Sequence, residues 1–196
     1  MMMNMNMNIQ IGHTLEGSEI YGPGLRSVLW VQGCTLACKG CWNTQYWSPT
    51  GGITTSVDEI VEKWASTPEL EGITLLGGEP LQQVGPVQDL IRGARRMGLS
   101  VFLYTGYEPE EFTPDMLNCF NMSDIVVTGR YVHQLRNTNL RWRGSTNQVV
   151  HFPTPRYQAL DIEEQHEVEV HLSSEGELSV YGYATDEFLT SIEVKS

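Results

Sequence analysis

The sequence predicts an α/β fold, a partial and open parallel β/α barrel that carries a C-terminal antiparallel hairpin. Short apolar strands alternate with amphipathic helices between residues 25 and 128, which is the pattern of parallel strands joined by right-handed crossovers. About four such strands are too few to close an eight-stranded barrel. After residue 150, two segments alternate polar and apolar residues, which is typical of a hairpin with one wet face.

The first strand and the first helix have clear boundaries. The segment 25–32 is largely apolar, contains two valines and is followed by Gly33, as is typical of a buried strand. A helix then begins after Ser56, which can cap it, with Glu59 at the capping-box position. This helix ends near Pro68.

The later elements continue the same alternation. Apolar runs predict three more strands, and apolar stripes at helical spacing predict two more helices. The strands cover 73–76, 100–104 and 124–127, the helices cover about 86–97 and 114–120, and the hairpin strands cover 167–172 and 177–181.

We expect one domain in three parts, because no proline- or serine-rich linker divides the chain. Residues 1–11 are of low complexity and predict a disordered tail. Residues 12–152 form the core. Residues 153–196 form a hairpin and an acidic appendage of the same domain.

Charge and composition exclude several classes of partner. The formal net charge of -12 argues against binding to nucleic acid, which needs a basic surface. No apolar run approaches the roughly 18 residues of a membrane span, and the first residues do not form an export signal, so we expect a cytoplasmic protein. From Asp161 onward, ten residues are acidic and Lys195 alone is basic, which indicates a solvated face or an acidic docking surface.

Four unusual loops follow the four predicted parallel strands. They are a cysteine loop after Gly33, the sequence GGEP at 77–80, TGY at 105–107 and TGR at 128–130. Ligands of open parallel sheets bind beyond the carboxyl ends of the strands. The four loops therefore predict one binding site at that edge.

The cysteine loop contains three thiols and no nearby fourth ligand. Cys34, Cys38 and Cys41 stand at x3 and x2 spacing. A structural zinc ion takes four protein ligands, and only a distant side chain such as His13 or His133 could supply the fourth. A [4Fe-4S] cluster takes one thiolate at each iron, so three cysteines leave one iron open for a substrate or cofactor. Buried or redox-active thiols are a third interpretation.

Some polar residues allow two interpretations each. Arg26 could form an ion pair with a carboxylate in the site, or it could be a charged residue at the edge of the sheet. The segment RGSTNQ at 143–148 could belong to the site or form a polar turn. Cys119 lies among Met116, Leu117 and Phe120, so we expect it in the core.

Several motifs together resemble a known family. GPGLR precedes the first strand, and GCTLACKGCWN, LLGGEPL, LYTGY, DIVVTGRYV and RWRGSTNQVV follow in order. From about Gly12 to His151, the chain resembles the anaerobic ribonucleotide reductase activating proteins. These are glycyl-radical enzyme activases of the radical S-adenosylmethionine (SAM) superfamily. The fold that this resemblance implies is the open barrel of the radical SAM type.

The resemblance implies a role for each matching residue. The three cysteines would hold a [4Fe-4S] cluster and would be the catalytic and metal-binding residues, with SAM on the open iron. The GGEP turn would contact the methionine part of SAM through Gly77, Gly78 and Glu79. Gly40 and Trp42 flank the third cysteine, where the family contacts adenine.

The implied activity is a radical reaction on another protein. The enzyme would cleave SAM reductively and generate a glycyl radical on a partner, an anaerobic ribonucleotide reductase. A one-electron donor such as flavodoxin or ferredoxin would supply the electron. Two alternatives stay open: a radical SAM enzyme for a small molecule or a ribosomal peptide, and a non-enzyme, either an iron-sulfur redox sensor or a zinc-stabilised binding module.

Overall fold

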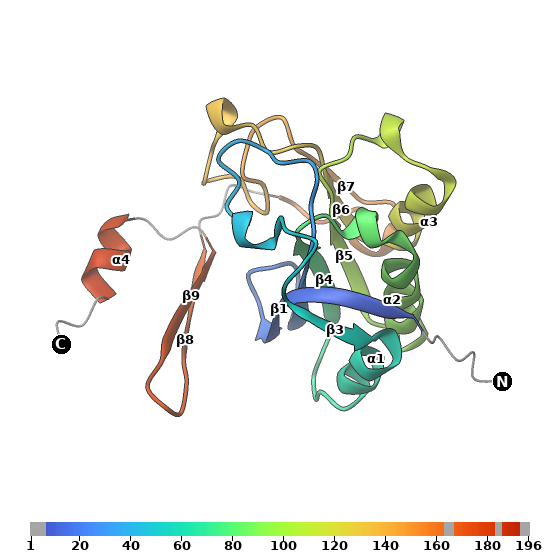
Figure 1. The fold of residues 1–196 in the computed structure, drawn as a ribbon, viewed down its shortest axis with the longest axis horizontal. Helices are drawn as coiled ribbons and strands as arrows, with labels where there is room; N and C mark the ends of the chain where they lie inside the picture. Colours follow the sequence, from blue (N-terminus) through green and yellow to red (C-terminus); the bar gives the residue numbers. More distant parts are fainter. Residues whose placement is uncertain (1–6, 163–166, 183–185, 193–196) are drawn as a thin grey trace.

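The computed structural model describes residues 7–162, 167–182 and 186–192. A seven-stranded mixed sheet forms the centre, with its strands in the order β3-β1-β2-β4-β5-β6-β7 (Figure 1). The strands are β1 (Asn8–Ser18), β2 (Arg26–Val31), β3 (Ile53–Ser56), β4 (Gly72–Gly77), β5 (Ser100–Tyr104), β6 (Ile125–Thr128) and β7 (Val149–His151). The predicted parallel pairing of β2, β4, β5 and β6 is confirmed.

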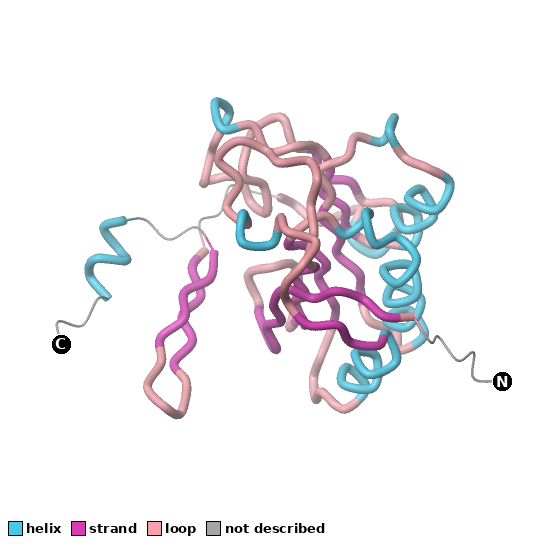
Figure 2. Tube along the Cα trace, viewed as in Figure 1, coloured by secondary structure: helices cyan, strands magenta, loops and turns pink. Residues whose placement is uncertain are grey.

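Three helices cover one face of the sheet: α1 (Val57–Ala65), α2 (Val84–Arg96) and α3 (Pro114–Met122) (Figure 2). The predicted capping box is present, because the Ser56 side chain accepts from the Glu59 N–H and the Glu59 carboxylate accepts from the Ser56 N–H. The apolar stripe of α2 is buried against the sheet. Apolar burial on this face is the main stabilising contribution to the fold. No helix in the described part of the chain is both long and apolar enough to cross a membrane.

The other face of the sheet, called the inner face below, carries a second set of apolar side chains. Strand residues alternate between faces, so Leu15, Val28, Trp30 and Leu76 cluster here. Further along, the chain after β7 runs back over Phe102 and packs Tyr157, Leu160 and Ile162 around it. The segment 152–162 is therefore part of the core packing.

The prediction of a disordered tail over residues 1–11 is wrong for its last part. Asn8–Ile11 belong to β1 and pair with β3. Ile9 and Ile11 are each 1% exposed, and their burial against the helices holds the strand in place. Residues 1–6 lie outside the described residues.

Arg26 lies at the amino end of β2, away from the predicted site. It is fully buried, and its hydrogen bonds to the described residues include none to a carboxylate. Its guanidinium donates to Thr74 Oγ1 at 2.8 Å, to Ser100 Oγ at 2.7 Å and to three carbonyl oxygens. Gly72 leaves room for it, since a Cβ there would lie 2.3 Å from the guanidinium. Both sequence interpretations of Arg26 are wrong, and the side chain instead ties three strands together.

A two-stranded hairpin forms a second sheet that is not hydrogen-bonded into the main one. Strands β8 (Val168–Leu172) and β9 (Leu178–Gly182) pair antiparallel, and a short helix α4 (Asp186–Ile192) follows. The hairpin lies on the side of the sheet opposite to the three core helices (Figure 1).

Candidate functional site

The loops after the four parallel strands meet at one cavity. Its volume is about 180 Å³, and it opens at the carboxyl edge of the sheet. The cavity is lined by residues of the cysteine loop, the GGEP turn, the TGY and TGR turns and the RGSTNQ segment, among them Cys34, Cys38, Cys41, Trp42, Gly77, Gly78, Glu79, Thr105, Gly106, Gly129, Gly144 and Gln148. The structure therefore brings together residues that are separated by more than 100 positions in the sequence.

Backbone hydrogen bonds hold the cysteine loop in a defined shape. The Gly33 N–H donates to the Tyr46 carbonyl at 2.8 Å, and the Cys34 N–H donates to the Trp47 carbonyl at 3.0 Å. The Cys41 N–H closes a turn onto the Cys38 carbonyl at 3.0 Å. These hydrogen bonds fix the loop whose thiols line the cavity.

The donor set of this cavity fits an iron-sulfur cluster. All three thiols are half-buried, and burial raises the pKa of Cys34 and of Cys38. Within the described ranges, no group of three or more His, Cys, Asp and Glu side chains converges closely enough to hold one metal ion. In a cluster, each thiolate binds its own iron, so thiols spread around one cavity suit it.

The GGEP turn lies directly against the cysteine loop. The Gly78 N–H donates to the Val31 carbonyl at 2.8 Å, and the Glu79 N–H donates to the Gly33 carbonyl at 2.9 Å. Glycine is required here, since a Cβ on Gly78 would lie 2.3 Å from the Gly33 oxygen. The closeness of these two backbones sets the shape of the cavity.

Replacing Gly78 by alanine is expected to destabilise the protein by about 1–3 kcal/mol, because backbone atoms must move to admit the methyl group. Gly85→Ala is the matched control, since a Cβ there meets only the flexible end of Met7. In the helix, that change is expected to be neutral or to stabilise by up to about 1 kcal/mol. Urea unfolding of both variants measures the difference, and equal stabilities would contradict the close contact.

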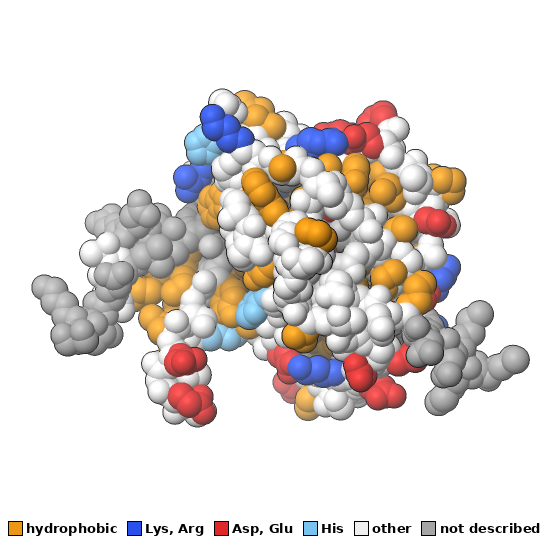
Figure 3. All heavy atoms as spheres, in the orientation of Figure 1, with side chains coloured by type: hydrophobic (Ala, Val, Ile, Leu, Met, Phe, Trp, Pro, Cys, Tyr) orange, Lys and Arg blue, Asp and Glu red, His pale blue; other side chains and the backbone are white. Residues whose placement is uncertain are grey.

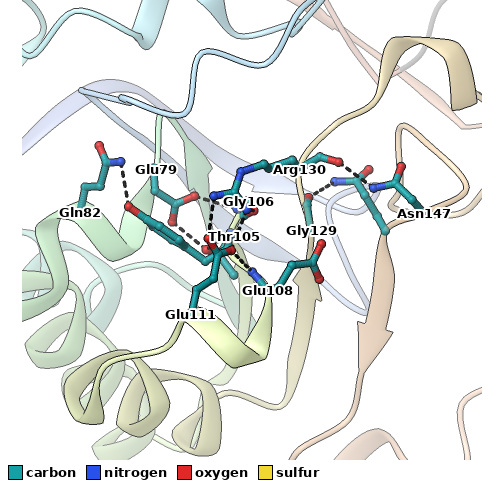
Figure 4. A network of polar contacts seen from close by, with 11 residues as sticks. Glu79, Gln82, Thr105, Gly106, Glu108, Glu111, Gly129, Arg130 and Asn147 are labelled. Carbon is teal, nitrogen blue, oxygen red and sulfur yellow. Dashed lines mark hydrogen bonds and ion pairs between the residues drawn. The ribbon is translucent and has the colours of Figure 1, made fainter.

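The Glu79 carboxylate points toward groups of the neighbouring turns, with which it forms hydrogen bonds (Figure 4). It accepts from the Leu81 N–H at 2.9 Å, from Thr105 Oγ1 at 2.8 Å and from the Gly106 N–H at 2.7 Å. Burial raises the pKa of Glu79 to about 7, and these hydrogen bonds oppose the rise. The side chain therefore connects the GGEP and TGY turns, and it is 2% exposed.

A second network fastens the remaining loops (Figure 4). Arg130 donates two hydrogen bonds to Glu111, at 2.6 and 2.7 Å. Asn147 Nδ2 donates to the Arg130 carbonyl at 2.8 Å, and Gln148 Nε2 donates to the Gly129 carbonyl at 3.1 Å. The polar residues of RGSTNQ thus hold their segment against the TGR turn, and Gly144 and Gln148 also line the cavity.

The two residues that flank Cys41 have different positions. Trp42 lines the cavity, is 40% exposed and carries the Arg136 guanidinium 4.9 Å from its ring centre. Gly40 is not among the lining residues. A Cβ on Gly40 would lie 2.8 Å from the His133 ring, so this glycine lets the cysteine loop approach His133.

Cys119 is a core residue, as the sequence predicts. Its side chain is fully buried in α3 among the apolar residues beneath the sheet. Burial raises the pKa of this thiol to about 12. Cys119 is remote from the cavity lining and cannot complete a set of four cysteines there.

Sequence reasoning did not place Trp142 and Tyr181 in the site region. Trp142 lines the cysteine cavity and has a φ of +61°, a backbone conformation that is unusual for a residue with a side chain. Tyr181 of β9 packs near Trp30 on the inner face. Its position depends on how the hairpin folds back, which no local pattern encodes.

Comparison with known proteins agrees with this geometry. A family model described as a 4Fe-4S single cluster domain matches residues 20–151. The anaerobic ribonucleoside-triphosphate reductase-activating protein of Escherichia coli K12 is 34% identical over 140 residues, which are 67% of this chain and 91% of that protein. The protein of the same name from Enterobacteria phage T4 is 33% identical over 135 residues, 66% of this chain and 85% of that protein.

Among solved structures, the crystal structure of QueE from Escherichia coli matches part of the chain. It covers 50% of this chain and 52% of its own, with a TM-score of 0.41 and 15% identity. The chain belongs to the radical SAM iron-sulfur family of anaerobic ribonucleoside-triphosphate reductase-activating proteins.

Proposed function

We propose that this chain activates an anaerobic ribonucleotide reductase by generating a glycyl radical on it, with a [4Fe-4S] cluster and SAM as cofactors. The observation that carries the proposal is the meeting of three clustered thiols with the GGEP turn at one cavity. Relatives that this chain matches over 91% of their length bear the name of reductase-activating proteins. We further interpret β2, β4, β5 and β6 as a partial barrel, open on one side, and we place the enzyme in the cytoplasm.

Cys34, Cys38 and Cys41 would hold the cluster, since thiolates are the ligands of iron-sulfur centres. When bound, the reduced cluster would supply one electron to the sulfonium of SAM, and cleavage of a carbon–sulfur bond would leave methionine and a carbon radical that can take a hydrogen atom. The protein would provide placement and shield the reaction from water. No general acid or base is needed for a hydrogen-atom transfer.

The GGEP turn would place SAM through its backbone. Gly77 and Gly78 line the cavity with backbone atoms alone, and a Cβ on either would collide with the backbone of Trp30 or of Gly33. The Glu79 carboxylate already accepts three hydrogen bonds, so we assign it to holding the turn. Carbonyl oxygens of the turn are then the acceptors that suit the amino group of SAM. Trp42, on the wall of the cavity, would contact adenine, and Gly40 would act by setting the position of the cysteine loop.

An electron spin resonance experiment tests the proposal. The enzyme is reconstituted anaerobically with iron and sulfide and mixed with SAM, a reductant and the anaerobic ribonucleotide reductase of the same organism. We expect an organic radical on the reductase. Methionine formation without any protein radical would reject the activase and favour the small-molecule or peptide alternative.

We propose that the electron donor is an acidic carrier such as flavodoxin or ferredoxin. The chain has 12 Lys and Arg residues against 24 Asp and Glu, yet Lys39 and Arg136 lie on or next to the cysteine loop. Figure 3 shows cationic side chains gathered at the upper left of the molecule. Such a local excess of positive charge steers an acidic protein toward the cluster.

Lys39→Glu is therefore expected to slow reduction by flavodoxin about fivefold at low salt, and the effect should shrink as salt is added. Lys39 is exposed in the cysteine loop. Reduction by dithionite should not change, since a small reductant needs no docking surface. Lys63→Glu on α1 is the control, because Lys63 pairs with Glu16 elsewhere. An equal loss with both reductants would contradict a docking role.

A further inference from the structure

The hairpin β8–β9 is an addition to the family core. The family model ends at residue 151, whereas the hairpin strands span 168–172 and 178–182. The hairpin nevertheless contacts the core at defined points. Ser18 Oγ, which is fully buried, donates to Glu169 Oε2 at 2.6 Å. Tyr181 Oη and His13 Nε2 are 3.2 Å apart, and their rings stack at 6.1 Å.

The hairpin turns its polar face toward the sheet. Glu169 and Tyr181 are cross-strand partners and therefore lie on the same face, the one that contacts β1. The opposite face exposes Val170 by 44%, Leu172 by 70% and Leu178 by 46%. A hairpin that served only to cover the sheet would bury its apolar face. The contact with the sheet is instead made by Glu169 and by Tyr181, which packs on the apolar cluster around Trp30, and a space remains between hairpin and sheet beside it.

That space is a chamber of about 430 Å³. Its walls come from both sides, with His13, Tyr21 and Trp30 from the sheet side and Tyr181 from the hairpin. The chamber adjoins the cysteine cavity, and the residues that line both are Trp42, Asn43, Leu76, Tyr104 and Trp142. A ligand in the chamber is therefore next to the place where the cofactors would react.

We propose that the hairpin is the outer wall of the substrate chamber and holds an extended, glycine-bearing segment of the partner protein against the inner face of the sheet. This inference rests on the proposed function and adds the element that selects the substrate. The volume is in the range of ligand-sized sites, so the chamber admits a short segment and excludes a folded domain. The chamber lies between strands of the sheet and of the hairpin, so it has the form of a slot. Aromatic rings can pack directly on the backbone of a glycine, which has no side chain.

Full-length Tyr181 variants test the inference, with SAM, reductant and the reductase of the same organism. Tyr181→Ala removes the aromatic wall. We expect the half-saturating reductase concentration to rise about tenfold and the number of glycyl radicals formed per SAM cleaved to fall. Tyr181→Phe retains the ring and should stay within about threefold of the wild type.

Leu172→Ser is the matched control, because Leu172 is on the opposite face of the same hairpin, and it should behave like the wild type. An unchanged reductase dependence in Tyr181→Ala would overturn the inference. A higher radical yield would also overturn it, since the hairpin would then obstruct the partner.

Hydrogen exchange of the wild-type enzyme gives an independent readout. Adding the reductase should protect amides of β9 and of β1, and unchanged exchange in both strands would contradict the chamber. The two proposals fail separately. A wild-type enzyme that cleaves SAM and forms no glycyl radical rejects the proposed function. If the wild type forms the radical and Tyr181→Ala has the same dependence on reductase concentration, only the role of the hairpin is rejected.

Discussion

Replacing Cys34, Cys38 or Cys41 by alanine is expected to reduce SAM cleavage to the background rate. The three thiols line one cavity, and the described part of the chain offers no further cysteine there, because Cys119 is buried in the core. A cluster that loses one of three protein ligands is no longer held firmly in the protein or in the position that the reaction needs. Iron content, visible absorbance and 5′-deoxyadenosine formation measure the loss.

Cys119→Ala is the matched control for the three cysteine variants. It removes a thiol of the same kind from the apolar side of the fold, at a cost of about 1 kcal/mol in stability. Its iron content and its rate of SAM cleavage should match those of the wild type. If one variant of the cysteine loop kept full activity, that cysteine would not be a ligand.

Arg26→Met is expected to lower the free energy of unfolding by about 3 kcal/mol or more. Methionine retains the length of the side chain but removes donors that now satisfy Thr74, Ser100 and three carbonyl groups. Each buried acceptor left without a partner costs about 1–3 kcal/mol. Burial lowers the pKa of Arg26 to about 10, so the guanidinium still carries its charge at neutral pH.

Urea unfolding of the apoprotein measures this effect. Arg92→Met on α2 is the control, since Arg92 is an exposed residue that pairs with Asp89 one turn earlier. Exposed pairs of this kind contribute between 0 and about 1 kcal/mol. A loss below about 1 kcal/mol in Arg26→Met would show that the buried network does not hold the strands together.

The sequence predicts the centre of the fold well because that part has strong local patterns. The strand at Ser100–Tyr104 has its predicted bounds, and α1 begins at its capping box. The outer strands are less predictable. The stretch that contains Ile9 and Ile11 has a polar, repetitive beginning, and its burial depends on pairing with β3, 42 or more positions away.

The candidate site shows the same division. Spacing alone groups the three cysteines, and the rule for parallel sheets brings GGEP, TGY and TGR to them. Local pattern does not show that the Glu79 carboxylate bonds within its own chain, or that Tyr181 reaches Trp30. Those contacts depend on distant segments, as does the polar contact of the hairpin with β1.

The most direct test of the central claim follows one hydrogen atom. The reductase is prepared with glycine deuterated at the α-carbon and is incubated anaerobically with the reconstituted enzyme, SAM and a reductant. Mass spectrometry of the 5′-deoxyadenosine then reports the source of the hydrogen that it has gained. The proposed function predicts one deuterium per molecule formed in step with the glycyl radical. Unlabelled 5′-deoxyadenosine from a mixture in which the glycyl radical forms would contradict it.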